Sequence, residues 1–154
     1  MRFWFDTEFY EDGRCIQLIS IGIVAADGRT YYAETTQSRA LANASDWLAE
    51  NVKPHLTGAI TLRDRMRADI VTFMGDKPEI WAYYADYDWV VLCQLFGRMI
   101  DLPEGWPMYC RDIKQLADDL GNPKLPPQAT AAHNALNDAL WARDAWAFLM
   151  GLPK

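Results

Sequence analysis

The hydrophobic pattern of the first 35 residues is that of β-strands. Residues 2–8 have the sequence RFWFDTE, in which aromatic side chains lead into two acids, and residues 15–28 carry a β-branched run typical of a central strand. Asp27-Gly28 is a strong signal for a two-residue hairpin turn, which would return the chain as a third strand over residues 29–35. The pattern therefore predicts a three-stranded antiparallel meander.

Helical patterns follow the meander. Ser45 is placed to cap a short helix that ends before Pro54. Thr61, with Asp64 three residues on, resembles a capping box for a second helix. Gly75 is the expected end of that helix.

Strands and helices then alternate. Residues 79–84 predict a fourth strand, a helix begins at Asp86 or within the next two residues, and residues 106–110 offer a short fifth strand. Residues 111–120 predict a further helix, which Gly121 ends. This alternation is typical of strand–helix–strand units.

The last part of the chain combines a loop and a long helix. Residues 122–129, NPKLPPQA, are too rich in proline for regular structure. Residues 133–150 have a helical pattern whose close-packing face is made by Ala135, Ala139, Ala142 and Trp146. Because parallel strands need helical crossovers, the chain is predicted to form a single α/β domain over residues 1–154. We expect a ribonuclease H-like mixed sheet, a three-stranded antiparallel meander plus parallel strands, flanked by helices.

Composition and charge narrow the classes of function. A formal charge of −6 argues against a broad basic surface that would hold a long nucleic acid through many phosphates. The three cysteines, Cys15, Cys93 and Cys110, show no ligand spacing, so we expect free buried thiols rather than disulfides or a zinc site. No apolar run reaches the roughly 18 residues of a membrane helix, and no signal peptide is recognisable. We therefore expect a soluble, cytoplasmic protein without membrane contact.

Two acids lie inside the first apolar strand. Side chains alternate along a strand, so Asp6 and Glu8 point to one face, about 6 to 7 Å apart, while Thr7 points to the other. Two like charges in a buried strand repel each other and lose hydration, unless a cation or a proton offsets them. The alternative is that this end of the strand lies in solvent and both carboxylates are hydrated.

Further acids occur where later elements begin. Asp88 stands where a strand passes into a helix, and Asp86 competes with it for the same role; either could be an ordinary acid favoured by the helix dipole. His133 and Asp138 form an H-x4-D pair at the start of the last helix, although a loop histidine is often structural or exposed. Oxygen ligands without cysteine suit Mg²⁺ or Mn²⁺, and two such ions can act together on a phosphodiester.

The order and spacing of these residues resemble the three motifs of the DEDDh exonucleases, represented here by Asp6-Thr7-Glu8, by Tyr87-Asp88, and by His133 with Asp138. The run DTEFYEDG, followed by QLISIGIVAADGRTYYAE, looks most similar to the small bacterial ribonuclease AS type, a group of polyadenylate-specific 3′-exoribonucleases. Many DEDDh relatives carry an asparagine a few residues before the second-motif acid. This chain has AYYAD there, at residues 82–86.

The resemblance implies a metal-dependent enzyme that hydrolyses the 3′ ends of single-stranded RNA to 5′-nucleotides, with a leaning to adenylate-rich ends. Two divalent ions, Mg²⁺ or Mn²⁺, would be held by Asp6, Glu8, Asp88 and Asp138. His133 would act as the general base that takes a proton from the attacking water. The resemblance also implies a homodimer.

Aromatic residues beside the first motif are candidates for contact with the substrate. Phe9 and Tyr10 could stack on the last bases, and backbone groups beside Thr7 could meet the ribose 2′-hydroxyl. A phenylalanine next to a strand end can equally belong to the core. Six tryptophans lie in apolar patterns where core packing is the simpler interpretation: Trp4, Trp47, Trp81, Trp89, Trp141 and Trp146.

Two other functions are compatible with the same residues. The first is the same chemistry on single-stranded DNA, because recognition of a 2′-hydroxyl by backbone groups leaves little trace in residue types. The second is a nucleic-acid-binding or interaction domain that has kept the fold without catalysis. Such a domain has no physical need for four converging acids, whose repulsion only a metal would relieve.

Overall fold

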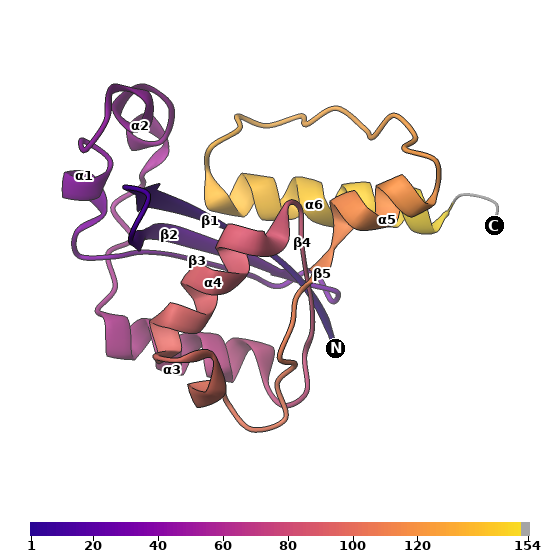
Figure 1. The fold of residues 1–154 in the computed structure, drawn as a ribbon, viewed down its shortest axis with the longest axis horizontal. Helices are drawn as coiled ribbons and strands as arrows, with labels where there is room; N and C mark the ends of the chain where they lie inside the picture. The colour runs from indigo at the N-terminus through magenta and orange to yellow at the C-terminus, as the bar shows by residue number, and fades with distance from the viewer. Residues whose placement is uncertain (152–154) are drawn as a thin grey trace.

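A computed structural model describes residues 1–151 and shows one mixed β-sheet with helices on both faces (Figure 1). The strand order is β3-β2-β1-β4-β5. The strands are β1 (Arg2–Glu11), β2 (Ile16–Ala25), β3 (Thr30–Glu34), β4 (Glu79–Ala82) and β5 (Arg111–Asp112). β2 pairs antiparallel with β1 and β3, while β4 pairs parallel with β1 and β5, so the expected meander and parallel additions are confirmed. Residues 152–154 of the expected domain lie outside the described range.

Helices occupy most of the segments predicted for them. They are α1 (Ser38–Leu41), α2 (Asp46–Asn51), α3 (Arg63–Met74), α4 (Ala85–Phe96), α5 (Ile113–Asp119) and α6 (Ala135–Met150), with short 3₁₀ turns η1 (Lys53–His55) and η2 (Met99–Asp101). Ser45 caps α2 as predicted, since its hydroxyl accepts the Leu48 N–H at 3.2 Å. The proline-rich segment forms the loop that runs beside α6 (Figure 1). Within residues 1–151, no helix is long and apolar enough to cross a membrane.

The hairpin between β2 and β3 is one residue longer than predicted. Three residues separate Ala25 from Arg29, and the Ala25 N–H donates to the Arg29 carbonyl at 2.9 Å. The Gly28 N–H donates to the Ala25 carbonyl, and Gly28 has φ +90°. The loop is therefore a tight turn followed by a left-handed glycine. The Asp27-Gly28 pair predicted the place of the hairpin correctly but not the length of its loop, because glycine also suits the last position of a three-residue loop.

Thr61 does not cap α3, contrary to prediction. The N-cap is Leu62, and its side chain makes no capping hydrogen bond. The Thr61 N–H instead donates to the Glu34 carbonyl at 2.8 Å, which ties this segment to the end of β3. Long-range backbone pairing has overridden the local capping signal.

The fifth strand is also displaced from its predicted position at residues 106–110. Trp106 is buried, and its indole N–H donates to the Gly75 carbonyl at 3.0 Å. β5 begins only at Arg111, which is paired with Trp81 of β4. Within residues 106–110, Trp106 is buried in the core beneath the sheet, whereas Met108 and Tyr109 are exposed, so the apolar run is not a strand.

The sheet separates two apolar clusters. Phe3 and Phe5 pack with residues of α3 and α4, and Trp4 packs with residues of α5 and α6. These two pairs of helices lie on opposite sides of the sheet (Figure 1). The same alternation continues along β1, so Asp6 points to the α6 side and Thr7 to the α4 side. The direction of each acid is therefore set by the pleat of the strand.

Helix α6 approaches the sheet very closely at Gly22. A Cβ atom at this position would overlap backbone atoms of Ala135 and Leu136 in the first turn of α6. Gly22 is also the partner of Asp6 in the β1–β2 register. The missing side chain therefore lets the N-terminal end of α6 lie directly beside the acids of β1.

Two of the three cysteines are less buried than expected. Cys15 is exposed in the turn between β1 and β2, where its N–H donates to Asp12 Oδ1 at 2.8 Å. Cys93 is buried and Cys110 is half-buried, and all three are free thiols. The turn places Cys15 outside the apolar pattern of the strand that follows it.

Candidate active site

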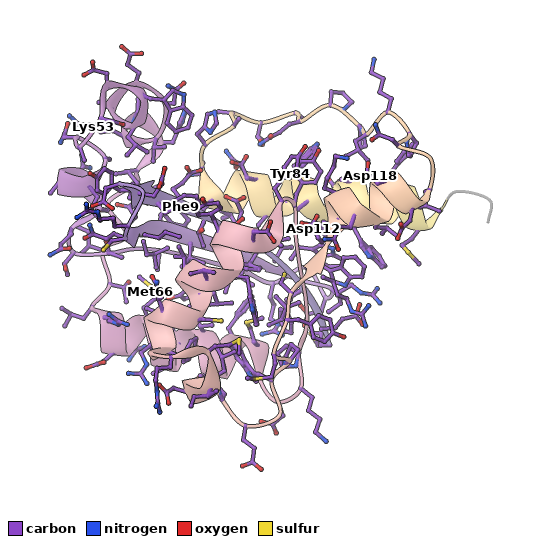
Figure 2. All side chains as sticks on the ribbon, in the orientation of Figure 1. Phe9, Lys53, Met66, Tyr84, Asp112 and Asp118 are labelled. Atoms are coloured by element: carbon purple, nitrogen blue, oxygen red, sulfur yellow. The ribbon has the colours of Figure 1, made fainter. Side chains whose placement is uncertain are left out.

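A cavity of about 360 Å³ lies beside the second half of β1 and is also lined from the N-terminal ends of α4 and α6. Acidic and aromatic side chains form its walls: Asp6, Thr7, Glu8, Phe9, Trp47, Tyr83, Tyr84, Tyr87, Asp88, His133 and Asp138. Figure 2 labels two of these residues, Phe9 on β1 and Tyr84 at the N-cap of α4. The cavity brings together all five residues proposed from the sequence as catalytic or metal-binding.

Strand β1 supplies the central acids. Glu8 is only 8% exposed, and Asp6 is half-buried on the same face of the strand. The pairing of β1 with β2 shifts register between Glu8 and Phe9, which is a bulge immediately after the acids. The structure therefore contradicts the alternative in which both carboxylates lie fully hydrated at an open strand end.

Helix α4 supplies a third acid. Asp88 is 6% exposed, and its Oδ1 accepts hydrogen bonds from the Thr7 N–H, at 2.9 Å, and from the Thr7 hydroxyl. Thr7 thus ties α4 to the strand that carries the first two acids. Asp86 is exposed and does not line the cavity. Of the two candidates in this motif, the geometry favours Asp88.

The N-terminal end of α6 supplies the fourth acid and the histidine. Asn134 caps the helix by accepting the Asn137 N–H at 3.1 Å. Asp138 accepts the His133 N–H at 2.9 Å and a hydrogen bond from the side-chain amide of Gln128. His133 has φ +63°, so a left-handed residue joins the loop to the helix. The cap and these two bonds fix Asp138 relative to His133.

Burial and mutual repulsion raise the pKa values of the four carboxyl groups. Burial raises the pKa of Glu8 from 4.5 to about 8, and the charges of Asp138 and Asp88 add to it. Burial raises the pKa of Asp88 to about 6, although the bonds from Thr7 act to lower it. The pKa values of Asp6 and Asp138 are also raised, mainly by burial. Ionising this cluster is unfavourable unless a cation joins it.

The donor set fits hard divalent cations. Ligand atoms of Glu8, His133 and Asp138 lie within 4.8 Å of one another. Asp6 and Asp88 line the same cavity, and within residues 1–151 no lysine or arginine lines it. Carboxylate oxygens are the ligands that Mg²⁺ and Mn²⁺ prefer, and the charge of such an ion would relieve the repulsion.

Aromatic rings form the rest of the wall, and the sequence pointed to only one of them. Phe9 stacks on Tyr87, with ring centroids 5.6 Å apart and planes 7° apart. Trp47, expected in the core, is 53% exposed, and its ring meets the ring of His133 edge-on at 4.9 Å. Tyr10 does not line the cavity and packs instead against the apolar cluster beneath α2. Tyr84 and Tyr83 complete the aromatic wall.

Comparison with known proteins identifies relatives by sequence. Over residues 1–150 the chain matches the family described as 3′-5′ exoribonuclease Rv2179c-like domain. Two curated relatives come from Mycobacterium tuberculosis: 3′-5′ exoribonuclease MT2234.1 of strain CDC 1551 / Oshkosh and 3′-5′ exoribonuclease Rv2179c of strain ATCC 25618 / H37Rv. Each is 42% identical over 147 residues, with 90% of this chain and 87% of the relative covered.

Solved structures show the same fold at low sequence identity. Exonuclease I has a TM-score of 0.63 at 13% identity; the match covers 97% of this chain and 40% of that chain. A chain from the structure of the yeast NOT1 MIF4G domain co-crystallised with CAF1 has a TM-score of 0.54 at 14% identity, and 97% of this chain and 80% of that chain are covered. The predicted ribonuclease H-like α/β fold is thereby confirmed.

Proposed function

The chain belongs to the Rv2179c-like 3′-5′ exoribonuclease domain family, and we propose that it shortens single-stranded RNA from the 3′ end as a DEDDh-type enzyme close to ribonuclease AS. The proposed reaction is hydrolysis of the terminal phosphodiester with release of a 5′-nucleotide. The observation that carries this proposal is the convergence of four carboxylates and one histidine in a single cavity. A domain without catalysis would have no physical need for buried acids that repel one another.

Two divalent ions, Mg²⁺ or Mn²⁺, would be held by Asp6, Glu8, Asp88 and Asp138. When bound, such ions stabilise the negative charge that develops on the phosphate oxygens. Asp6 is the proposed shared ligand: burial raises its pKa most, and the charges of all three other carboxylates add to the rise, which is consistent with a place among them. Thr7 orients Asp88 through two hydrogen bonds to one carboxylate oxygen, which leaves the second oxygen available.

His133 is the proposed general base. Its ring has a nitrogen within 4.8 Å of carboxylate oxygens of Glu8 and Asp138, and the edge-on contact with Trp47 supports the ring from the side of α2. Histidine is the side chain whose charge changes near neutral pH, which suits the removal of a proton from the attacking water. A position in the loop before α6 leaves the ring free to adjust to the substrate.

The cavity suits a single terminal nucleotide. A volume of about 360 Å³ is near the lower end of ligand pockets. Its aromatic rings offer faces on which a base can stack without a demand for sequence. An adenylate preference is proposed from the likeness to ribonuclease AS, since stacking area favours purines over pyrimidines but does not separate adenine from guanine. The homodimer and a cytoplasmic location stay predictions from the sequence.

The reaction is tested with 5′-labelled RNA and DNA homopolymers. With Mg²⁺ or Mn²⁺, we expect oligoadenylate to shorten stepwise from its 3′ end, and EDTA to stop the reaction. Oligodeoxyadenylate should be cut more slowly by about tenfold, because contacts to the 2′-hydroxyl are lost. If every RNA stays intact with metal present, the proposed function is wrong; equal rates on DNA would favour the single-stranded DNA alternative.

The His133→Asn variant should lose about 10²- to 10⁴-fold in kcat, because it lacks the general base. Asparagine tolerates a left-handed backbone and so keeps the N–H that binds Asp138. Stabilisation by Mn²⁺, measured as a shift of the melting temperature, should be largely retained. The control is His55→Asn, which changes the chain's other histidine and should alter kcat less than about twofold. Equal losses in both variants would contradict the assigned role.

A further inference from the structure

Tyr84 has a backbone conformation that tyrosine rarely adopts. As the N-cap of α4 it has φ +56° and ψ +53°, the left-handed region that favours glycine and asparagine. In the part of the chain that the structure describes, four residues other than glycine have positive φ: Lys77, Tyr84, Asn122 and His133. Tyr84 and His133 both line the cavity. Backbone strain of this kind tends to occur at functional sites.

Asp112 holds the conformation of Tyr84 in place. Its Oδ2 accepts the N–H of Ala85, the residue after Tyr84, at 2.9 Å. Its Oδ1 accepts the Lys114 N–H at 2.6 Å and so caps α5. One carboxylate therefore fixes the first turns of two helices. Tyr84 has little freedom to relax unless this connection breaks.

The side chain of Tyr84 gains little burial from the fold. It is 61% exposed, although its ring lines the cavity. Behind it, the ring of Tyr83 lies edge-on at 4.7 Å, and Tyr83 in turn meets the ring of Trp141 at 4.8 Å and 90°. The Tyr84 ring is thus supported by a series of aromatic contacts while much of its surface stays open.

We propose that Tyr84 is a substrate-contact residue that stacks on the terminal base of the RNA, and that its left-handed backbone presents the ring to that base. The inference rests on the proposed function. Glycine or asparagine would adopt this backbone with less strain, and the exposed ring of Tyr84 gains little from burial, so burial does not explain a tyrosine here. The described lining of the cavity has no lysine or arginine, and stacking supplies affinity without a positive charge.

A stack of Tyr84 on the terminal base would be equally strong in the bound substrate and in the transition state. Its loss should therefore change KM rather than kcat. Tyr84→Asn removes the ring and tolerates the backbone. We expect KM for 5′-labelled oligoadenylate to rise about tenfold, kcat to change less than about twofold, and the urea midpoint to stay constant or rise. Tyr84→Phe keeps the ring and should keep KM within about twofold.

Lys77→Asn is the matched control, because Lys77 also has a left-handed backbone, at φ +51°, and is exposed away from the cavity. It should move the urea midpoint in the same direction and leave KM unchanged. If wild type shortens RNA but Tyr84→Asn has a wild-type KM, or lowers the urea midpoint, Tyr84 is a structural residue and the inference is wrong. If wild type itself leaves RNA intact, the proposed function fails first and the inference falls with it.

Discussion

Asp6→Asn should abolish RNA cleavage and, in the metal-free protein, stabilise the fold. Cleavage should fall by about 10³-fold or more, because Asp6 is the proposed shared ligand of both metal ions. At pH 8.5 without metal, the free energy of unfolding should rise by on the order of 1 kcal/mol, since one of four carboxylates that repel one another is gone. Urea denaturation and initial rates of cleavage measure the two effects.

The same cluster gives the metal-free protein a pH dependence of definite sign. The pKa of Glu8 rises from 4.5 to about 8, and that of Asp88 from 3.8 to about 6. Between these values the folded protein holds protons that the unfolded chain has released. Their contribution to stability is therefore full below about pH 4 and is lost as the pH rises to 8. Asp6→Asn should reduce this loss, and saturating Mn²⁺ should oppose it.

The control for Asp6→Asn is Asp86→Asn. Asp86 is exposed at the start of α4 and does not line the cavity. Its substitution should change cleavage less than about twofold and stability by less than about 0.5 kcal/mol. The metal-site assignment fails if Asp6→Asn leaves cleavage intact. The second-motif assignment fails if Asp86→Asn stops cleavage while Asp88→Asn does not.

The parts of the fold that local patterns determine were predictable. The β-branched run of β2 and the capping serine at residue 45 act over a few residues, and both gave the correct element. Thr61 shows where this approach fails, because its N–H pairs with the Glu34 carbonyl, 27 residues earlier in the chain. The prediction of a strand at residues 106–110 fails for the same reason, since Trp106 is held by contacts with Phe96 and Gly75. Tertiary contacts override local signals at these points.

The acids of the site were predictable because buried charge is unusual. Asp6 and Glu8 interrupt an apolar strand, and that conflict is visible in the sequence. Trp47 gave no such signal, because an aromatic residue in a short amphipathic helix usually faces the core. Tyr84 gave no signal either, since its left-handed backbone is accompanied by a hydrogen bond from Ala85 to Asp112, 27 residues further along the chain. Aromatic walls of a cavity are therefore harder to predict than its acids.

Gly22→Ala should separate α6 from the sheet and disable the site without a change in any proposed ligand. The added Cβ would overlap the backbone of Ala135 and Leu136, and no side-chain rotation can relieve a backbone clash. The first turn of α6 must then shift, and with it Asp138. We expect a loss of about 2–4 kcal/mol in the free energy of unfolding. Cleavage should fall by about 10²-fold or more, because a displacement near 1 Å is enough for such a loss.

Gly151→Ala is the matched control at the other end of α6. Gly151 has φ −86°, and an added Cβ would meet the carbonyl oxygens of Ala147 and Phe148 at an ordinary 3.5 Å. This variant should keep both stability and cleavage near wild type. A stabilising osmolyte at about 1 M should restore the folded population of Gly22→Ala. Cleavage should nevertheless stay low, because the first turn of α6 remains displaced. Wild-type rates in the refolded variant would show that the close approach at Gly22 stabilises the fold but does not position Asp138.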